Sequence, residues 1–186
     1  FRSEKNIFGL TKATGLLALI LLCYTVKTIS RNSEWKNNFT LFSADLLNSP
    51  NSAMAHHNFA SELINSGQAE QDFKKRKNIF LKTIEEEKKA LTINPSYAQA
   101  YCNIGLSFIQ LNEYKEAMSP LRKAINISPL YPDALLDLGY CYLQEGNLDS
   151  ALILCETATK NDSSYYLPYL NLGSIYLKKM DIGKAL

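Results

Sequence analysis

Polar residues that could hold another polypeptide recur at a fixed spacing along the chain. Asn103, Asp137 and Asn171 are each separated by 34 residues, and Asn58 lies 45 residues before Asn103. A carboxamide both donates and accepts hydrogen bonds, so it can pair with a main-chain amide unit without reading side chains. This row therefore predicts sequence-tolerant binding of an extended peptide, with Asp137 interrupting the asparagines. The alternative is that these residues form a helix surface with no ligand.

The other chemistry-bearing residue types form no catalytic or metal-binding pattern. His56 and His57 are adjacent, so on a helix they point about 100° apart, and no carboxylate or cysteine is spaced to join them. The four cysteines form no CxxC motif, and buried thiols are favoured over a Cys141–Cys155 disulfide. Neither a glycine-rich phosphate loop nor a nucleophile elbow occurs. We therefore expect no catalytic residue, no metal site and no cofactor within these residues.

The composition is that of an ordinary globular protein. The chain has 186 residues, of which 46% are hydrophobic and 20% charged, and its net charge at pH 7 is +2. This balance excludes a disordered chain and provides no basic field for nucleic acid. A basic run at 74–77 precedes Glu85, which lies four residues before Lys89, so we favour a solvated helical face there over an anionic contact.

The elements that must position the polar row follow from an internal repeat. The segments 98–131, 132–165 and 166–186 align with a spacing of 34 residues and no gap. Small residues recur in register, namely Gly105, Gly139 and Gly173, and Ala117, Ala151 and Ala185. Each unit is therefore expected to be two antiparallel helices that cross closely at the small residues, with Asn112 and Gly146 in the turn. This is the pattern of the tetratricopeptide repeat.

An earlier, divergent unit is expected over residues 53–97. Its first helix begins 45 residues before that of the next unit, so it holds eleven residues more than the repeat length. We expect the additional residues within 68–90, where they either lengthen the second helix or add a turn before it. One stripe of such a long helix would contain Phe73, Phe80, Ile84 and Leu91. The partial unit 166–186 stops inside its expected second helix, so we expect further repeats after Leu186.

The first residues include an apolar segment of membrane-spanning length. Residues 13–26 carry no charge, and the apolar stretch 7–26 has twenty residues, which as a helix span roughly 30 Å. We predict a transmembrane helix, with its flank, over residues 1–27. A signal-peptide core and a buried helix of a soluble domain are the alternatives, and the flanking charges favour neither orientation.

A helical linker is expected over residues 28–52, with the Trp35 indole packed on the first repeat. The linker contains Arg31-Asn32-x-x-Trp35, then Leu41-Phe42, and Pro50-Asn51-Ser52-Ala53 opens the repeats. With an apolar helix before it and repeats after it, the chain resembles the transmembrane and tetratricopeptide repeat-containing O-mannosyltransferase family and its bacterial relatives. The expected fold is all-α, an N-terminal transmembrane helix followed by a tetratricopeptide α-solenoid.

This resemblance implies that residues 7–26 are the last membrane span of an enzyme and that the repeats lie on the extracytoplasmic side, in the periplasm or the ER lumen. The catalytic acidic residues of such enzymes lie in an early extracytoplasmic loop, which is not part of these residues. The repeats would be a protein-interaction arm whose concave face recruits acceptor polypeptide for sugar transfer from a polyprenyl-linked donor. A non-enzymatic, membrane-anchored scaffold for complex assembly is the alternative, and a secreted repeat protein is a third.

Overall fold

The chain is helical throughout the part that the structure describes. The computed structural model describes the backbone of residues 2–34, 36–161 and 166–185, and the side chains of residues 14–30, 32, 36–160 and 166–180. Within these limits there are nine helices and no strand, so the predicted all-α class is confirmed. The chain divides into two compact units, Phe1–Ala44 and Asp45–Leu186.

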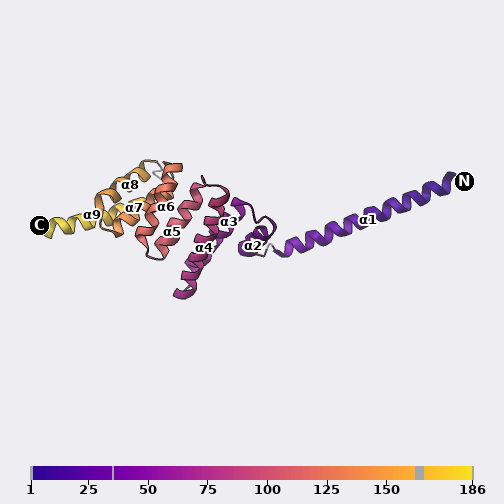
Figure 1. Cartoon of the computed structure of the whole chain (residues 1–186), viewed down its shortest axis with the longest axis horizontal. Helices are drawn as coiled ribbons and strands as arrows, with labels where there is room; N and C mark the ends of the chain where they lie inside the picture. The colour runs from indigo at the N-terminus through magenta and orange to yellow at the C-terminus, as the bar shows by residue number, and fades with distance from the viewer. Residues whose placement is uncertain (1, 35, 162–165, 186) are drawn as a thin grey trace. The chain divides into compact units, whose positions relative to one another are not determined.

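The first unit consists mainly of one long helix, α1 (Arg2–Glu34), at the indigo end of the chain in Figure 1. Every side chain between residues 14 and 30 is exposed, leucines included. Among the residues described, no helix is both long and apolar enough to cross a membrane. The structure therefore does not support the transmembrane helix predicted over 7–26, and the part of it before Thr14 lies outside the described side chains.

The predicted linker, 28–52, is divided between two helices. Its first part continues α1, and α2 (Asn38–Asn48) follows. The side chain of Asn37 caps α2, because its Oδ1 accepts a hydrogen bond of 2.9 Å from the main-chain N–H of Thr40. Trp35, which was expected to pack on the first repeat, lies outside the described residues.

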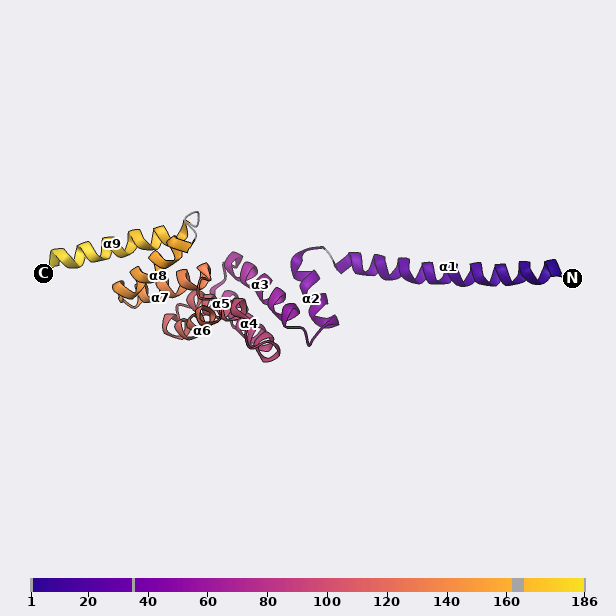
Figure 2. The same cartoon turned by 90° about the horizontal axis from the view of Figure 1, so that it is seen from above.

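The second unit is a stack of antiparallel helix hairpins (Figures 1 and 2). The three hairpins are α3 (Ala53–Ala69) with α4 (Phe73–Ile93), α5 (Ala98–Gln110) with α6 (Tyr114–Ile127), and α7 (Pro132–Gln144) with α8 (Leu148–Asn161). The last helix, α9 (Leu167–Ala185), packs on α7 and α8. This arrangement confirms the predicted tetratricopeptide-type solenoid.

The helices of the stack form two rows that differ in their contacts. The first helices of the units, α3, α5, α7 and α9, each contact the next first helix along the chain. The second helices, α4, α6 and α8, make no such contact with one another among the described residues. The first helices therefore approach one another more closely, and side chains on them are brought into one continuous row.

Close crossings at glycine hold the hairpins together. A Cβ added to Gly105 would overlap the side chain of Leu121 on α6, and one added to Gly139 would lie 3.0 Å from Cys155 Sγ on α8. Both crossings lie where the repeat pattern predicts them. Asn112 (φ 61°) and Gly146 (φ 81°) occupy the predicted turns in the left-handed conformation, which follows the ends of α5 and α7.

The eleven additional residues of the first hairpin are shared by both of its helices. α4 has 21 residues where α6 has 14, and α3 has 17 where α5 has 13. A longer second helix, one of the two expected alternatives, accounts for seven of the eleven, and the lengthening of α3 by four residues was not expected. Phe80 and Ile84 of the predicted stripe are buried, but Phe73 is 65% exposed because it lies on the added part of α4.

The last unit differs from the repeat pattern. The sequence predicts a turn near Met180, which occupies the place of Asn112 and Gly146, yet α9 continues to Ala185 as one helix. Methionine does not readily adopt the left-handed conformation that such a turn requires. Gly173, in register with Gly105, has no atom of another residue near its Cβ position. The described part of the last unit is thus a single helix rather than a partial hairpin.

A pair of glycine substitutions tests the crossings. Gly105→Ala should lower the free energy of unfolding by about 1–3 kcal/mol, because the new methyl group overlaps the buried Leu121. The control Gly173→Ala, in open space, should be neutral or stabilising by up to about 1 kcal/mol because alanine favours helix. Urea denaturation followed by circular dichroism measures both, and equal effects at the two positions would contradict the close crossing.

Candidate functional site

The predicted polar row contributes one residue from each first helix. Asn58 lies on α3, Asn103 on α5, Asp137 on α7 and Asn171 on α9, and all four are half-buried. The first helices contact one another in succession, so each of four successive first helices carries one residue of the row. Their surroundings differ from one helix to the next.

Asn103 is fixed by hydrogen bonds to two other helices. Its side-chain Nδ2 donates to Glu87 Oε1 of α4 at 2.6 Å and to Ser61 Oγ of α3 at 3.2 Å. The amide hydrogens are therefore used inside the fold, and only Oδ1 can act on a ligand, as an acceptor. The sequence predicts that this residue both donates to a ligand and accepts from it, and in the structure the role of donor to a ligand is lost.

Glu87 is the centre of this buried group. Its side chain is fully buried, and His57 Nδ1 lies 3.0 Å from its Oε1. Burial raises the pKa of the Glu87 carboxyl, while the hydrogen bonds from His57 and Asn103 oppose that rise. The His57 ring also packs on the ring of Tyr97, with centroids 4.7 Å apart. Residues of α3, α4 and α5 thereby meet at one carboxylate.

His56 forms a second histidine–glutamate pair beside the first. Its Nδ1 lies 2.7 Å from Glu86 Oε2, and its Nε2 lies 2.9 Å from the main-chain oxygen of Pro50. A main-chain oxygen can only accept, so Nε2 carries the proton of the second hydrogen bond. The two contacts hold the ring between α4 and the segment that precedes α3.

These pairs correct one conclusion from the sequence. No carboxylate was expected to join His56 and His57, yet Glu86 and Glu87 do so from the antiparallel helix 30 residues later. A signal was present, because Glu87 falls on the same helical stripe as Phe80, Ile84 and Leu91, and a buried acid needs partners. The expected packing role of the histidines stands. No cluster that could hold a metal ion occurs among the described side chains.

Asp137 is a weak acid in the middle of the row. Burial, together with the negative charge of Asp133 one turn earlier, raises its pKa from 3.8 to about 7. A protonated carboxyl has one donor and one acceptor, as a carboxamide does. Near neutral pH, Asp137 therefore alternates between a form that continues the row of asparagines and an ionised form that interrupts it.

The cysteines near the row are inert thiols. Cys102, Cys141 and Cys155 are buried and unpaired by disulfides, as the sequence predicts, and Cys23 on α1 is an exposed thiol. Burial raises the pKa of Cys155 to about 11, against a hydrogen bond from Asn171, and the pKa of Cys141 to about 12. These values exclude a reactive thiolate at neutral pH.

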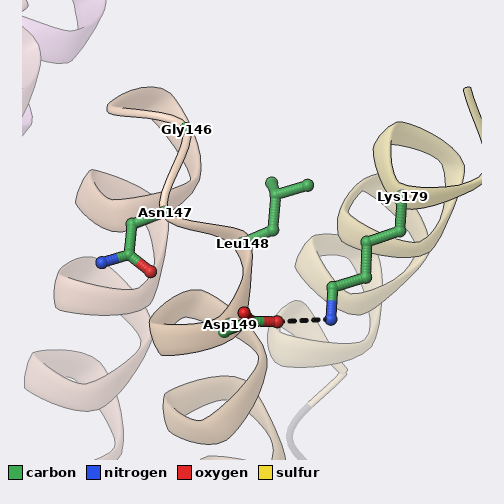
Figure 3. Close-up of a pocket in the computed structure, with 5 residues that line it drawn as sticks. All are labelled: Gly146, Asn147, Leu148, Asp149 and Lys179. Carbon is green, nitrogen blue, oxygen red and sulfur yellow. Dashed lines mark hydrogen bonds and ion pairs between the residues drawn. The ribbon is translucent and has the colours of Figure 1, made fainter. Parts of the chain in front are cut away.

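A shallow depression beside the α7–α8 turn lies apart from the predicted residues (Figure 3). It is lined by Gly146, Asn147, Leu148, Asp149 and Lys179. Lys179 Nζ lies 2.7 Å from Asp149 Oδ1, but the Asp149 side chain is 86% exposed. An ion pair this open to water contributes little to stability, and Asp149 and Lys179 have no other catalytic residue type beside them in the lining. We therefore do not assign a site to this depression.

Comparison with known proteins supports the repeat assignment. Residues 108–172 match the family model for the tetratricopeptide repeat. Two curated relatives, the Protein O-mannosyl-transferase TMTC3 of Mus musculus and that of Homo sapiens, are each 30% identical over 101 residues. The match covers 54% of this chain but only 10% of either relative. The chain thus carries tetratricopeptide repeats and is similar to a small part of a mannosyltransferase.

Solved structures share the fold at low sequence identity. The TPR protein TTC0263 of Thermus thermophilus has a TM-score of 0.64 and 20% identity, covering 73% of this chain and 70% of its own. MamA has a TM-score of 0.62 and 22% identity, covering 74% of each chain. The first TPR of Spaghetti (RPAP3), solved with an HSP90 peptide, has a TM-score of 0.61 and 14% identity, covering 69% and 94%. At these identities the likeness shows the fold alone.

Two neighbouring glutamates test the buried group. Glu87→Ala should lower the free energy of unfolding by about 2–4 kcal/mol, because His57 and Asn103 lose a common partner inside the fold. Glu85→Ala is the matched control, since Glu85 is exposed and forms a surface ion pair with Lys89, and it should leave the urea midpoint nearly unchanged. Equal shifts of the urea midpoint would show that the contacts of Glu87 with His57 and Asn103 do not stabilise the fold.

The pKa of Asp137 predicts a pH-dependent stability. A raised pKa means that the folded state favours the protonated carboxyl, so its contribution to stability is complete below pH 4 and is lost as the pH rises towards 7. Asp137→Asn should match the wild type near pH 4 and exceed it by on the order of a few kcal/mol above pH 8. Thermal unfolding across this range measures the difference, and a constant difference at every pH would contradict the assignment.

Proposed function

We propose that the repeats are the protein-interaction arm of a membrane-embedded glycosyltransferase and recruit acceptor polypeptide for sugar transfer from a polyprenyl-linked donor. The observation that carries the binding part is the polar row of Asn58, Asn103, Asp137 and Asn171, one from each first helix. Polar residues that recur once per repeat along a solenoid can bind an extended peptide, because each repeat contacts a further segment of the peptide main chain. The tetratricopeptide fold itself is well suited to a protein-binding scaffold.

The polypeptide in this proposal lies along the concave face and is held by its main chain. Asn103 accepts from a ligand N–H through Oδ1, since its Nδ2 is directed to Glu87 and Ser61. Asp137 accepts when ionised and can also donate when protonated. The rigid attachment of Asn103 favours binding, because a preorganised side chain loses little freedom when the ligand arrives. A tetratricopeptide domain solved with an HSP90 peptide provides a precedent for a peptide ligand on this fold.

The transferase part of the proposal is supported by the similarity to the TMTC3 mannosyltransferases. Because the chain matches about a tenth of their length, the chemistry would belong to another part of the protein. The exposed leucines of α1 support membrane contact by residues 7–26. In this proposal the repeats lie on the extracytoplasmic side, in the periplasm or the ER lumen.

The sequence encoded upstream of Phe1 distinguishes the transferase from a membrane-anchored scaffold without an enzyme. Several apolar spans, with a pair of acidic residues in an extracytoplasmic loop, are expected if the chain is a transferase arm. A short polar segment before Phe1 would instead favour the scaffold for complex assembly. Sequencing the intact gene provides this result without any assumption about the sugar or the acceptor.

Substitution of the polar row tests peptide binding. An immobilised array of unstructured peptides of varied sequence should bind the wild-type chain, and Asn171→Ala should weaken that binding by about three- to tenfold through loss of one main-chain contact. Asn126→Ala, the same change at an exposed position of α6, serves as the control and should bind as the wild type does. Equal binding by both variants would remove the row from the ligand site.

A further inference from the structure

The added part of α4 carries an unusual charge. α4 contains seven lysine and arginine residues against three glutamates, so its net charge is +4 while that of the whole chain is +2. Two of the glutamates, Glu86 and Glu87, are buried with the histidines and are not available at the surface. The positive charge of α4 is therefore compensated on other helices rather than along its own exposed face.

The first ten residues of α4, residues 73–82, are called the α4 tip here. The four cations at 74–77 lie within the seven residues by which α4 exceeds α6, and Figure 1 shows this end of α4 extending past the neighbouring helices. No ion pair joins Lys74, Lys75, Arg76 or Lys77 to an acid among the described side chains. The ion pairs of α4 with its own glutamates involve Lys89, in its last turns.

Apolar side chains accompany these cations. Phe73 is 65% exposed and Leu81 is 45% exposed. Phe73, Lys77 and Leu81 are spaced by four residues each, so they lie along one face of the helix. The guanidinium of Arg76 lies 5.8 Å from the centre of the Phe73 ring. Cations and exposed apolar groups thus share the same end of the first hairpin.

We propose that the α4 tip binds the surface of an anionic phospholipid bilayer. Clustered lysine and arginine side chains are attracted to acidic headgroups, and an aromatic ring beside them gains free energy by entering the headgroup region. An acidic polypeptide would pair with the cations but would leave Phe73 and Leu81 in water. The solvated face expected from the sequence rested on ion pairing, which the structure limits to Lys89. This proposal does not depend on the proposed peptide binding.

The test places a fluorescent reporter at the tip of the full chain. Phe73→Trp is combined with Trp35→Phe, so that the introduced indole is the one tryptophan, and the protein is reconstituted into vesicles of phosphatidylcholine with or without phosphatidylserine. Brominated phosphatidylcholine quenches an indole that enters the bilayer. Quenching should occur in the anionic vesicles and should be at least about twofold weaker in the neutral ones. Salt should reduce it, because the attraction is screened.

Two variants with the same change in net charge distinguish an effect of the α4 tip from an effect of the overall charge of the protein. Substituting glutamine for Lys74, Lys75, Arg76 and Lys77 should reduce the quenching at least about twofold. Substituting glutamine for Lys115, Arg122, Lys123 and Lys160, on α6 and α8, makes the same change in net charge and should leave the quenching unchanged. All eight side chains except the half-buried Arg76 are exposed, so both variants should keep the helical circular dichroism of the parent.

Three outcomes would overturn the proposal. Equal quenching in neutral and anionic vesicles, or an equal loss in the two charge-matched variants, would show that the tip does not recognise anionic lipid. An indole that is not quenched by either vesicle but shifts its emission with added polyglutamate would identify an acidic polypeptide as the partner instead.

Discussion

The steric contact between Leu121 and Gly105 sets the geometry on which the other features of the solenoid depend. Because Gly105 has no Cβ, α5 and α6 approach closely, and the Leu121 side chain packs against the main chain of α5. Gly139 and Cys155 repeat this contact one unit later. Where this contact is made, the two helices of a hairpin lie close together, and successive hairpins stack through their first helices. The first helices in turn carry the polar residues, one on each.

The polar row has a structural role as well as the proposed binding role. Asn103 links three helices through Glu87 and Ser61. An asparagine at this position is therefore expected in a repeat even where no ligand binds, because it satisfies polar groups at the junction of successive units. The two roles are compatible, since an amide whose hydrogens are fixed inside the fold still presents its oxygen.

The sequence predicted those features that depend on local residue type and period. The hairpins, the turns at Asn112 and Gly146 and the glycine crossings follow from a 34-residue repeat that can be read along the chain. The histidine–glutamate pairs could not be read in this way, because their partners are 30 residues apart in the divergent unit, where no repeat supplies a register. The single helix α9 was missed for a different reason, since the period alone does not show that Met180 disfavours a turn.

The seven residues added to α4 and the four added to α3 correspond closely to two helical turns and one turn. An added length close to a whole number of turns leaves the azimuth of every later residue almost unchanged, so Phe80, Ile84 and Glu87 keep the buried orientation that the next hairpin requires. A hairpin of this solenoid can thus grow outward at its free end in steps of complete turns without disturbing the neighbouring unit. The added turns provide new surface, and their residues are not constrained by packing against the neighbouring hairpin.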